Sequence, residues 1–176
     1  KPLNDNEIKY NGQPIGLVIA ETFEMARYAA KKIKFVYEED AKFETDLKTN
    51  LEKARDPKKG LASMLKPPPP KPTGDFDKEY ERSHIKIDSQ FSHGTEHHNP
   101  MEMYASTVIY ESKDRLKIYY KTQGTINSQM YVANVFGLKM KNVQVISPFV
   151  GGGFGSGLRP QHQIFMAVMA SLALKR

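Results

Sequence analysis

A glycine-rich run near the carboxyl end constrains this chain more than any other feature of its sequence. Residues 151–157 read GGGFGSG, so five of the seven positions are glycine. Glycine loses much conformational freedom on folding, and such a run suits a place where the backbone adopts unusual dihedral angles or approaches another group closely. A short strand pattern at 142–146 precedes the run, and an apolar helix pattern at about 161–174 follows it. The sequence therefore predicts a strand, a tight loop and a helix, in that order.

The position of this loop allows two interpretations. Free N–H groups and the helix dipole favour an anion where a loop enters a helix, so the loop could cradle a cofactor. A tight turn with a purely structural role is the other interpretation. The known phosphate loops fit poorly, because the spacing is not GxGxxG and because Gly157 is followed by Leu158 and Arg159 in place of Lys and Ser or Thr.

A second stretch, HGTEHHNPME at 93–102, combines histidines with carboxylates, a set that invites a metal site. Adjacent side chains on an extended backbone point apart, however, and Pro100 prevents a helix that would bring His98 and Glu102 onto one face. We therefore favour a structural or supporting cluster. A small metalloprotein that uses His97 and His98 is the alternative.

A third stretch, KTQG at 121–124, follows a predicted strand and precedes a predicted helix. Its hydroxyl and amide groups are well placed to touch a ligand, and equally well placed to cap the helix. The sequence leaves both roles open.

The N-terminal part reads as a strand, a helix and a strand. Residues 15–20 form a short apolar run, Thr22 can cap a helix, and residues 34–38 alternate as a half-buried strand. In the helix we expect one apolar face made of Phe23, Ala26, Ala30 and Ile33. Two strands joined by a helix predict a βαβ element.

A charged, proline-containing segment separates this part from the rest. Residues 39–82 carry consecutive prolines at 67–70, which exclude a helix and a central strand at those positions, so we expect a linker there. Beyond it the expected elements are strands at 84–91, 106–110, 116–121 and 142–146, and helices at 125–136 and 161–174, with a hairpin turn at Lys113 and Asp114, a helix-ending Gly137, and Ile126, Met130 and Ala133 on one helix face. The predicted fold class is α+β, with parts at 1–55, 56–82 (the linker) and 83–176.

Composition excludes several classes of function. The chain has no cysteine, which rules out a disulfide framework, a cysteine-ligated iron–sulfur cluster, a cysteine-type zinc site and a cysteine nucleophile. The net charge of +6 comes from dispersed lysines with no stripe of basic and aromatic residues, so we expect a charged surface and no nucleic-acid partner. The apolar run at 164–174 is shorter than the roughly 20 residues of a membrane span. The chain begins with Lys1 in place of Met, and we expect an upstream segment to be missing.

Four blocks of this sequence resemble the molybdenum-cofactor-binding large subunit of the xanthine dehydrogenase and aldehyde oxidase family, most of all its bacterial isoquinoline- and aldehyde-oxidoreductase branch. The block EIKYNGQPIGLVIAETFEMARYAAKKIKFVYE at 7–38 resembles the latter half of that family's hammerhead domain. The blocks EHHNPMEMYAS at 96–106, KTQGTINSQ at 121–129 and ISPFVGGGFGSG at 146–157 resemble its molybdopterin-binding domain. The resemblance implies a partial hammerhead α/β unit followed by the first part of the molybdopterin-binding α+β domain.

The resemblance also implies roles for particular residues. Gly152, Gly153, Phe154 and Gly155 would bind the cofactor, with the N–H groups of the Phe154–Gly155 step near a metal oxo ligand. Glu96 stands where the family carries a Gln beside the metal's oxo or sulfido ligand, and a carboxylate there would be repelled unless it is protonated. The alternatives are that the match is shifted by about one residue or that the site differs from the family's. Leu158 stands where purine-oxidising members carry a substrate-binding Glu, so we expect no purine substrate.

The implied activity is hydroxylation of an aldehyde or N-heteroaromatic carbon with oxygen from water. The cofactor would be molybdenum–molybdopterin, in bacteria often as the cytosine dinucleotide. Iron–sulfur clusters and FAD would lie on partner chains or domains, so the expected partners are the remainder of the molybdenum subunit, an iron–sulfur subunit, an FAD subunit and a small-molecule substrate.

The family's catalytic glutamate, in a Gly-x-Gly-Glu setting, has no counterpart here. We therefore expect a segment with no catalytic residue and no protein ligand to the metal, which is inactive alone. The expected location is the cytoplasm, or the periplasm if the chain is exported with a partner. The rival interpretation is a stand-alone binding or interaction module whose glycine loop is structural.

Overall fold

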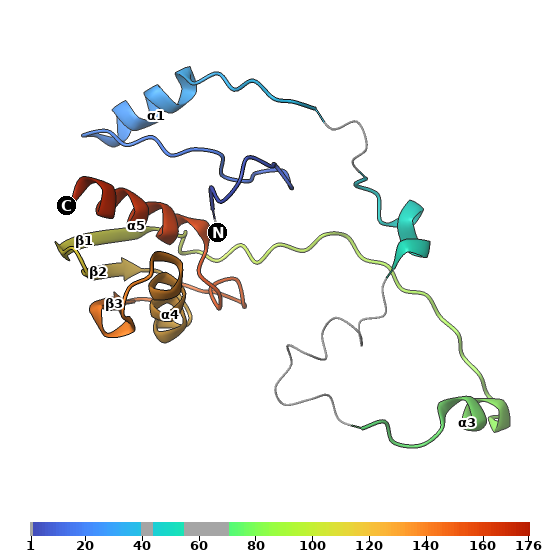
Figure 1. Cartoon of the computed structure of the whole chain (residues 1–176). Coiled ribbons are helices and arrows are strands. Elements are labelled where there is room, and N and C mark those ends of the chain that lie inside the picture. Colours follow the sequence, from blue (N-terminus) through green and yellow to red (C-terminus); the bar gives the residue numbers. More distant parts are fainter. Residues whose placement is uncertain (1, 40–43, 55–70) are drawn as a thin grey trace. The chain divides into compact units, whose positions relative to one another are not determined.

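The structure is a computed structural model, and it describes residues 2–39, 44–54 and 71–176 (Figure 1). The chain divides into two compact units, one made of Lys1–Lys34 with Thr95–Arg176 and the other of Phe35–Gly94. The prolines at 67–70 lie outside the described residues. Among the helices of the described residues, none is long and apolar enough to cross a membrane.

A three-stranded sheet organises the carboxyl-terminal part of the first unit (Figure 1). Strands β1 (Ser106–Ser112) and β2 (Arg115–Tyr120) pair as an antiparallel hairpin, and β3 (Val143–Ile146) pairs with the other edge of β2 in parallel. Helix α4 (Thr125–Phe136) connects the two parallel strands, and α5 (His162–Leu174) follows the glycine-rich run. A short 3-10 turn, η2 (Met140–Asn142), leads into β3.

One face of this sheet carries the core. Successive side chains of a strand point to opposite faces, so alternate residues of the central strand β2 are buried together. Both helices add side chains to the same cluster, which consists of Leu116, Ile118, Tyr120, Val132, Ala133, Val143, Ile164 and Val168. Burying a large apolar side chain contributes roughly 1.5–3 kcal/mol, so this cluster holds β2, β3, α4 and α5 in fixed positions.

The predicted elements of this part are largely confirmed. The hairpin turns at residues 113–114, and α4 has the predicted bounds. Gly137 ends α4 in the left-handed region, with φ of 67°, and its N–H bonds the carbonyl of Ala133. The short strand and the last helix each begin one residue later than predicted, at Val143 and His162.

The predicted face of α4 is wrong in part. Ile126 is 65% exposed and Met130 is also exposed, whereas Ser128, Val132 and Ala133 are buried. The helix is rotated in this way because the Ser128 hydroxyl is bonded on the inner side, where it donates to the Gly124 carbonyl over 3.0 Å. A polar residue therefore takes a position that the apolar pattern alone assigned to solvent.

The N-terminal part forms its helix without the two predicted strands. Helix α1 (Phe23–Lys32) is capped as predicted, with Thr22 Oγ1 accepting from the Met25 N–H over 3.2 Å. Its predicted apolar face is not buried, since no residue of α1 is buried. Residues 15–20 and 34–38 are not paired in a sheet, so the βαβ prediction is wrong there. A strand requires a hydrogen-bonded neighbour, and these segments meet none in the described part of the chain.

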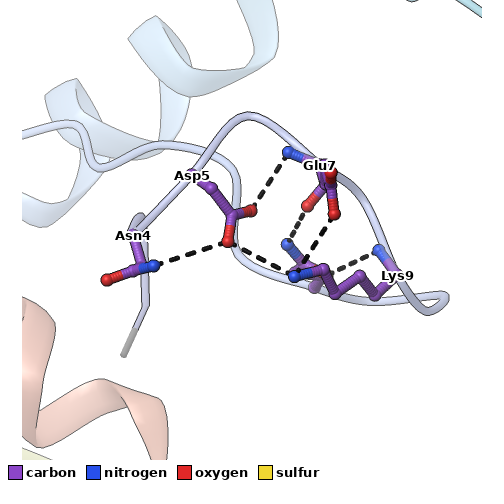
Figure 2. Close-up of polar contacts among 5 residues, drawn as sticks. Asn4, Asp5, Glu7 and Lys9 are labelled. Carbon is purple, nitrogen blue, oxygen red and sulfur yellow. Dashed lines mark hydrogen bonds and ion pairs between the residues drawn. The ribbon is translucent and has the colours of Figure 1, made fainter.

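A network of charged and amide groups shapes the turn that precedes this helix (Figure 2). The Asp5 carboxylate accepts from the Glu7 N–H over 3.1 Å and from Lys9 Nζ over 3.3 Å, while Gln13 bridges the Lys9 N–H and the Glu7 carbonyl. The bond from the Glu7 N–H, with help from Asn4 and Lys9, lowers the pKa of Asp5, and the bond to Asp5 raises the pKa of Lys9. Both groups are fully exposed, so water screens the pair and the network mainly defines the path of the turn.

The second unit contains short helices within the segment predicted to be a linker. Helix α3 (Phe76–Arg82) begins at Asp75, whose side chain accepts from the Lys78 N–H over 3.2 Å, and η1 (Lys48–Lys53) is a 3-10 turn. The helix at 76–82 was not predicted, because the nearby prolines indicated an extended linker over the whole segment. Residues 84–91, predicted as a strand, are not paired in a sheet.

Candidate functional site

The three polar and glycine-rich stretches meet in one place. Because β2 and β3 are parallel neighbours, the KTQG stretch that follows β2 and the glycine run that follows β3 leave the sheet at the same edge. The His-His-Asn-Pro stretch lies along the glycine run: a Cβ built on Gly155 would be 3.9 Å from His98 Nε2, and one on Gly152 would be 3.5 Å from Pro100 Cβ. The fold therefore assembles a site from segments that are far apart in sequence.

Glu102 holds the start of the glycine run through a reciprocal pair of bonds, which we name the first clasp. The Gly151 N–H donates to Glu102 Oε2 over 2.6 Å, and the Glu102 N–H donates to the Gly151 carbonyl over 2.9 Å. Bonds to a carboxylate are stronger than bonds between neutral groups. A Cβ on Gly151 would lie 2.6 Å from Glu102 Cβ, so the clasp also requires glycine at this position.

Gln123 holds the end of the run in the same way, forming the second clasp. The Gly157 N–H donates to Gln123 Oε1 over 2.9 Å, and the Gln123 N–H donates to the Gly157 carbonyl over 3.0 Å. The Gln123 side chain also packs on Gly153, where an added Cβ would lie 2.4 Å from its Cδ and Oε1 atoms. The loop is thus fastened to the neighbouring strand end by backbone and side chain together.

Thr122 connects this clasp to the beginning of α4. Its hydroxyl, almost fully buried, donates to the Gly157 carbonyl over 3.1 Å, lies 3.1 Å from the Ser128 hydroxyl, and accepts from the Gly124 N–H over 3.1 Å. Of the two roles that the sequence left open for the KTQG stretch, these contacts favour the structural one for Thr122. For Gln123 they reveal a third role, in which its side chain holds the loop.

Ser156 bonds the interior of the loop to itself. Its hydroxyl and its N–H both donate to the Gly153 carbonyl, over 2.7 and 2.9 Å, and the Tyr104 hydroxyl bonds the Ser156 hydroxyl. Lys121 lies over the Tyr104 ring, with its ammonium 4.1 Å from the centre of the ring. These contacts could not be predicted from local sequence patterns, because they join residues as much as 52 positions apart.

Gln161 and Tyr120 fasten the loop to the helix behind it. Gln161 Nε2 donates to the Ser156 carbonyl over 2.7 Å, and the Gln161 N–H donates to the Tyr120 hydroxyl over 2.8 Å. Burial raises the pKa of Tyr120, although the bond from Gln161 opposes this shift. The start of α5 is therefore connected to the core through a tyrosine that stays neutral at physiological pH.

The backbone of residues 152–155 takes an unusual form. Gly152, Phe154 and Gly155 have φ angles of 90°, 53° and 95°, and for a residue with a side chain the left-handed region costs about 1–2 kcal/mol. Within the described part of the chain, no hydrogen bond uses the N–H groups of residues 152–155. We name these four consecutive free donors the amide face. Strained backbone of this kind is concentrated at binding and catalytic sites.

The residues predicted to bind a cofactor fall into two groups. Gly152, Gly153, Phe154 and Gly155 lie together and form the amide face, whereas Glu96 is exposed in an extended segment. The carboxylate that contacts the loop is that of Glu102, whose role sequence reasoning missed. Its only sequence signal is its place in the same His-His-Asn-Pro block.

The metal-site alternative gains no support from the geometry. Within residues 2–39, 44–54 and 71–176, no three side chains of the His, Cys, Asp and Glu types come together as metal ligands. The donors available at this site are backbone N–H groups, which bind the anionic groups of a ligand and not a bare cation.

Two protein-family models match this chain. Residues 64–176 match the model of a molybdopterin cofactor-binding domain. Residues 1–41 match the model of the aldehyde oxidase and xanthine dehydrogenase a/b hammerhead domain. The glycine run and both of its clasps therefore fall inside the first match.

Curated relatives come from bacteria, plants and animals. The chain is 30% identical over 169 residues to the aldehyde oxidoreductase molybdenum-binding subunit PaoC of Escherichia coli K12, which covers 96% of the chain and 22% of the relative. It is 31% identical over 174 residues to an indole-3-acetaldehyde oxidase of Zea mays (98% and 13%) and 28% identical over 165 residues to a xanthine dehydrogenase/oxidase of Gallus gallus (93% and 11%). The chain thus spans less than a quarter of the length of each of these relatives.

Proposed function

Because this chain belongs to the molybdopterin cofactor-binding domain family of the aldehyde oxidases and xanthine dehydrogenases, we propose that its glycine loop forms one wall of the cofactor site of a molybdenum hydroxylase. The observation that carries this proposal is the amide face. Four consecutive N–H groups that meet no acceptor among the residues the structure describes suit the anionic oxo and dithiolene groups of such a cofactor, since donors held in place bind an anion with little reorganisation.

The rest of the loop supports this fit. Glycine at 155 leaves the backbone open, since an added Cβ would meet only His98 Nε2 within 4 Å, whereas glycine at 153 makes room for Gln123. The two clasps hold the ends of the loop in place. The Glu102 carboxylate accepts from Gly151, which reduces its repulsion of an anionic ligand. When bound, the cofactor supplies the two-electron oxidation of a substrate carbon with oxygen from water. This chain's own residues bind and orient it.

Glu96 is part of the same proposal. By the resemblance it stands beside the metal's oxo or sulfido ligand, and His98, two residues later, lies against Gly155. Glu96 would therefore lie beside the amide face, on the cofactor side of the site.

We further propose that the parent enzyme hydroxylates an aldehyde or an N-heteroaromatic carbon, and that this chain does not turn over alone. Leu158 in place of a substrate-binding Glu favours these substrates over purines. The hammerhead part would occupy residues 1–55, the linker 56–82 and the cofactor-binding part 83–176. These assignments rest on the resemblance of the blocks described above.

The electron carriers and their location complete this proposal. With no cysteine in the chain, the iron–sulfur clusters would be ligated by a partner subunit or domain, as would FAD. The cofactor would carry the cytosine dinucleotide, and the assembly would reside in the cytoplasm. Release of CMP from the denatured complex and fractionation of the source cells test these two statements.

Native mass spectrometry with metal analysis tests the central proposal. We expect the chain alone to be free of metal, and we expect its complex with the rest of the molybdenum subunit and a cysteine-rich partner to contain one molybdenum per chain. A chain that stays a monomer without metal or partners in the presence of those subunits would contradict the proposal. Turnover by the chain alone would contradict the claim of inactivity.

A further inference from the structure

We infer that Lys121, Tyr104 and Ser156 form a positioning relay that aims the Phe154 N–H at the cofactor. This inference rests on the proposed function, because it specifies how one donor of the amide face is held. The side chains of these three residues do not themselves touch the cofactor in this proposal. They act through the Gly153 carbonyl.

The donor of each hydrogen bond in this relay follows from the number of protons available. A carbonyl cannot donate, so the single hydroxyl proton of Ser156 goes to the Gly153 carbonyl over the 2.7 Å bond. The Ser156 oxygen is then an acceptor toward Tyr104, and the Tyr104 hydroxyl must be the donor of the bond between them. Each bond strengthens the next, because a hydroxyl that accepts a hydrogen bond becomes a better donor.

The anchored carbonyl determines where the Phe154 N–H points. The Gly153 C=O and the Phe154 N–H belong to one planar trans peptide, in which the two groups point in opposite directions. Since Ser156 binds the carbonyl through both its hydroxyl and its N–H, the Phe154 N–H is turned away from Ser156, and it meets no acceptor in residues 2–39, 44–54 and 71–176. The same logic applies to Gly151, whose carbonyl is held by Glu102 and whose peptide carries the Gly152 N–H.

Lys121 gives the relay its charge. The residue is only 4% exposed, and its ammonium has no hydrogen-bond acceptor in the described part of the chain. Burying an ammonium is costly unless another group compensates. Here the compensating group is the face of the Tyr104 ring, 4.1 Å away, and a cation on a ring face interacts more strongly when water is excluded. This contact keeps the ring in the one orientation in which its hydroxyl reaches Ser156.

Four variants of the full chain, labelled with ¹³C and ¹⁵N, test the relay by nuclear magnetic resonance. Tyr104→Phe and Ser156→Ala each remove one oxygen atom, whereas Lys121→Met removes the charge and Lys121→Arg keeps it. We expect the first two to shift the Gly153 carbonyl resonance upfield, and to make the Ser156 amide exchange about fivefold faster, which corresponds to about 1 kcal/mol for one hydrogen bond. Lys121→Met should shift the same carbonyl, and Lys121→Arg should restore most of the shift.

The matched control is Tyr119→Phe. Tyr119 is an exposed tyrosine on the face of β2 opposite the core, and its replacement should leave the Gly153 carbonyl resonance unchanged. An unchanged Gly153 carbonyl resonance in Ser156→Ala, with the other resonances intact, would overturn the relay. If Tyr104→Phe does not fold, the result for Ser156→Ala is sufficient by itself. Equal shifts in both Lys121 variants would overturn the role of the charge. Molybdenum content of the assembled complex separates the two proposals. A wild-type complex without molybdenum refutes the proposed function, whereas molybdenum retained in full by Ser156→Ala refutes the aim of the relay at the cofactor.

Discussion

Replacing Gly153 with alanine is the sharpest test of how the loop is held. An added Cβ would lie 2.4 Å from Cδ and Oε1 of Gln123 and 2.8 Å from its Cγ, which is closer than carbon atoms approach one another. The obstructing atoms belong to a side chain that can rotate away, so the backbone does not need to move. Gln123 then loses its bond to the Gly157 N–H, which is left buried and without a partner.

The expected cost follows from that lost bond. A buried donor left unsatisfied costs about 1–3 kcal/mol, so we expect Gly153→Ala to lower the free energy of unfolding by about 2 kcal/mol. For a chain of this size that corresponds to a fall in melting temperature of about 4–8 °C. Circular dichroism during thermal or urea unfolding measures both quantities. Gly94→Ala is the matched control, since nothing lies within 4 Å of its added Cβ, and it should change stability by less than about 0.5 kcal/mol.

A double-mutant cycle with Gln123→Ala tests whether Gly153 and Gln123 stabilise the loop through the same hydrogen bond. Gln123→Ala removes the same bond and should cost about as much as Gly153→Ala, about 2 kcal/mol. The double variant should cost little more than either single variant, because the alanine at 153 then meets no side chain. Costs that add fully would show that the two residues act independently, and an unchanged melting temperature in both single variants would refute the second clasp.

Three further predictions concern other parts of the site. Glu102→Gln should lower the free energy of unfolding by about 1 kcal/mol, because the 2.6 Å bond from Gly151 loses its charge, and an unchanged urea midpoint would disagree. Phe154→Gly should raise that free energy by about 0.5 kcal/mol, because relief of the left-handed backbone exceeds the added chain entropy, whereas Phe154→Ala should not. Burial raises the pKa of Tyr120 above its usual 10.0, so the folded state keeps this proton after the unfolded chain has lost it, and stability should fall as pH rises above about 10. Tyr120→Phe should flatten that fall, and an identical slope in both proteins would contradict it.

The local elements of the fold could be predicted well from the sequence. Patterns within a few residues predict the strand–loop–helix order around the glycine run, the hairpin at residues 113–114 and the end of α4 at Gly137. Each of these features is set by short-range chemistry, such as the tolerance of glycine for positive φ. The predicted strands at 15–20 and 34–38 failed for the complementary reason, since a strand depends on a neighbour that the described chain does not provide.

The candidate site could be predicted only in part. The glycine positions carried a signal, because their density is unusual and their order matched a known family. Glu102 carried none of its own, since its role appears only when a segment 49 residues away is folded against it. The burial of Lys121 could not be predicted, because a charged lysine ordinarily lies on the surface.

The reach of the two clasps has a consequence for the order of assembly. Their side-chain bonds close loops of 49 and 34 residues, and closing such loops has an entropic cost that β-pairing and core formation must offset first. The chain can therefore present its four donors only late in folding, after β2 and β3 have paired. On the proposed function, cofactor insertion would then follow the pairing of β2 and β3.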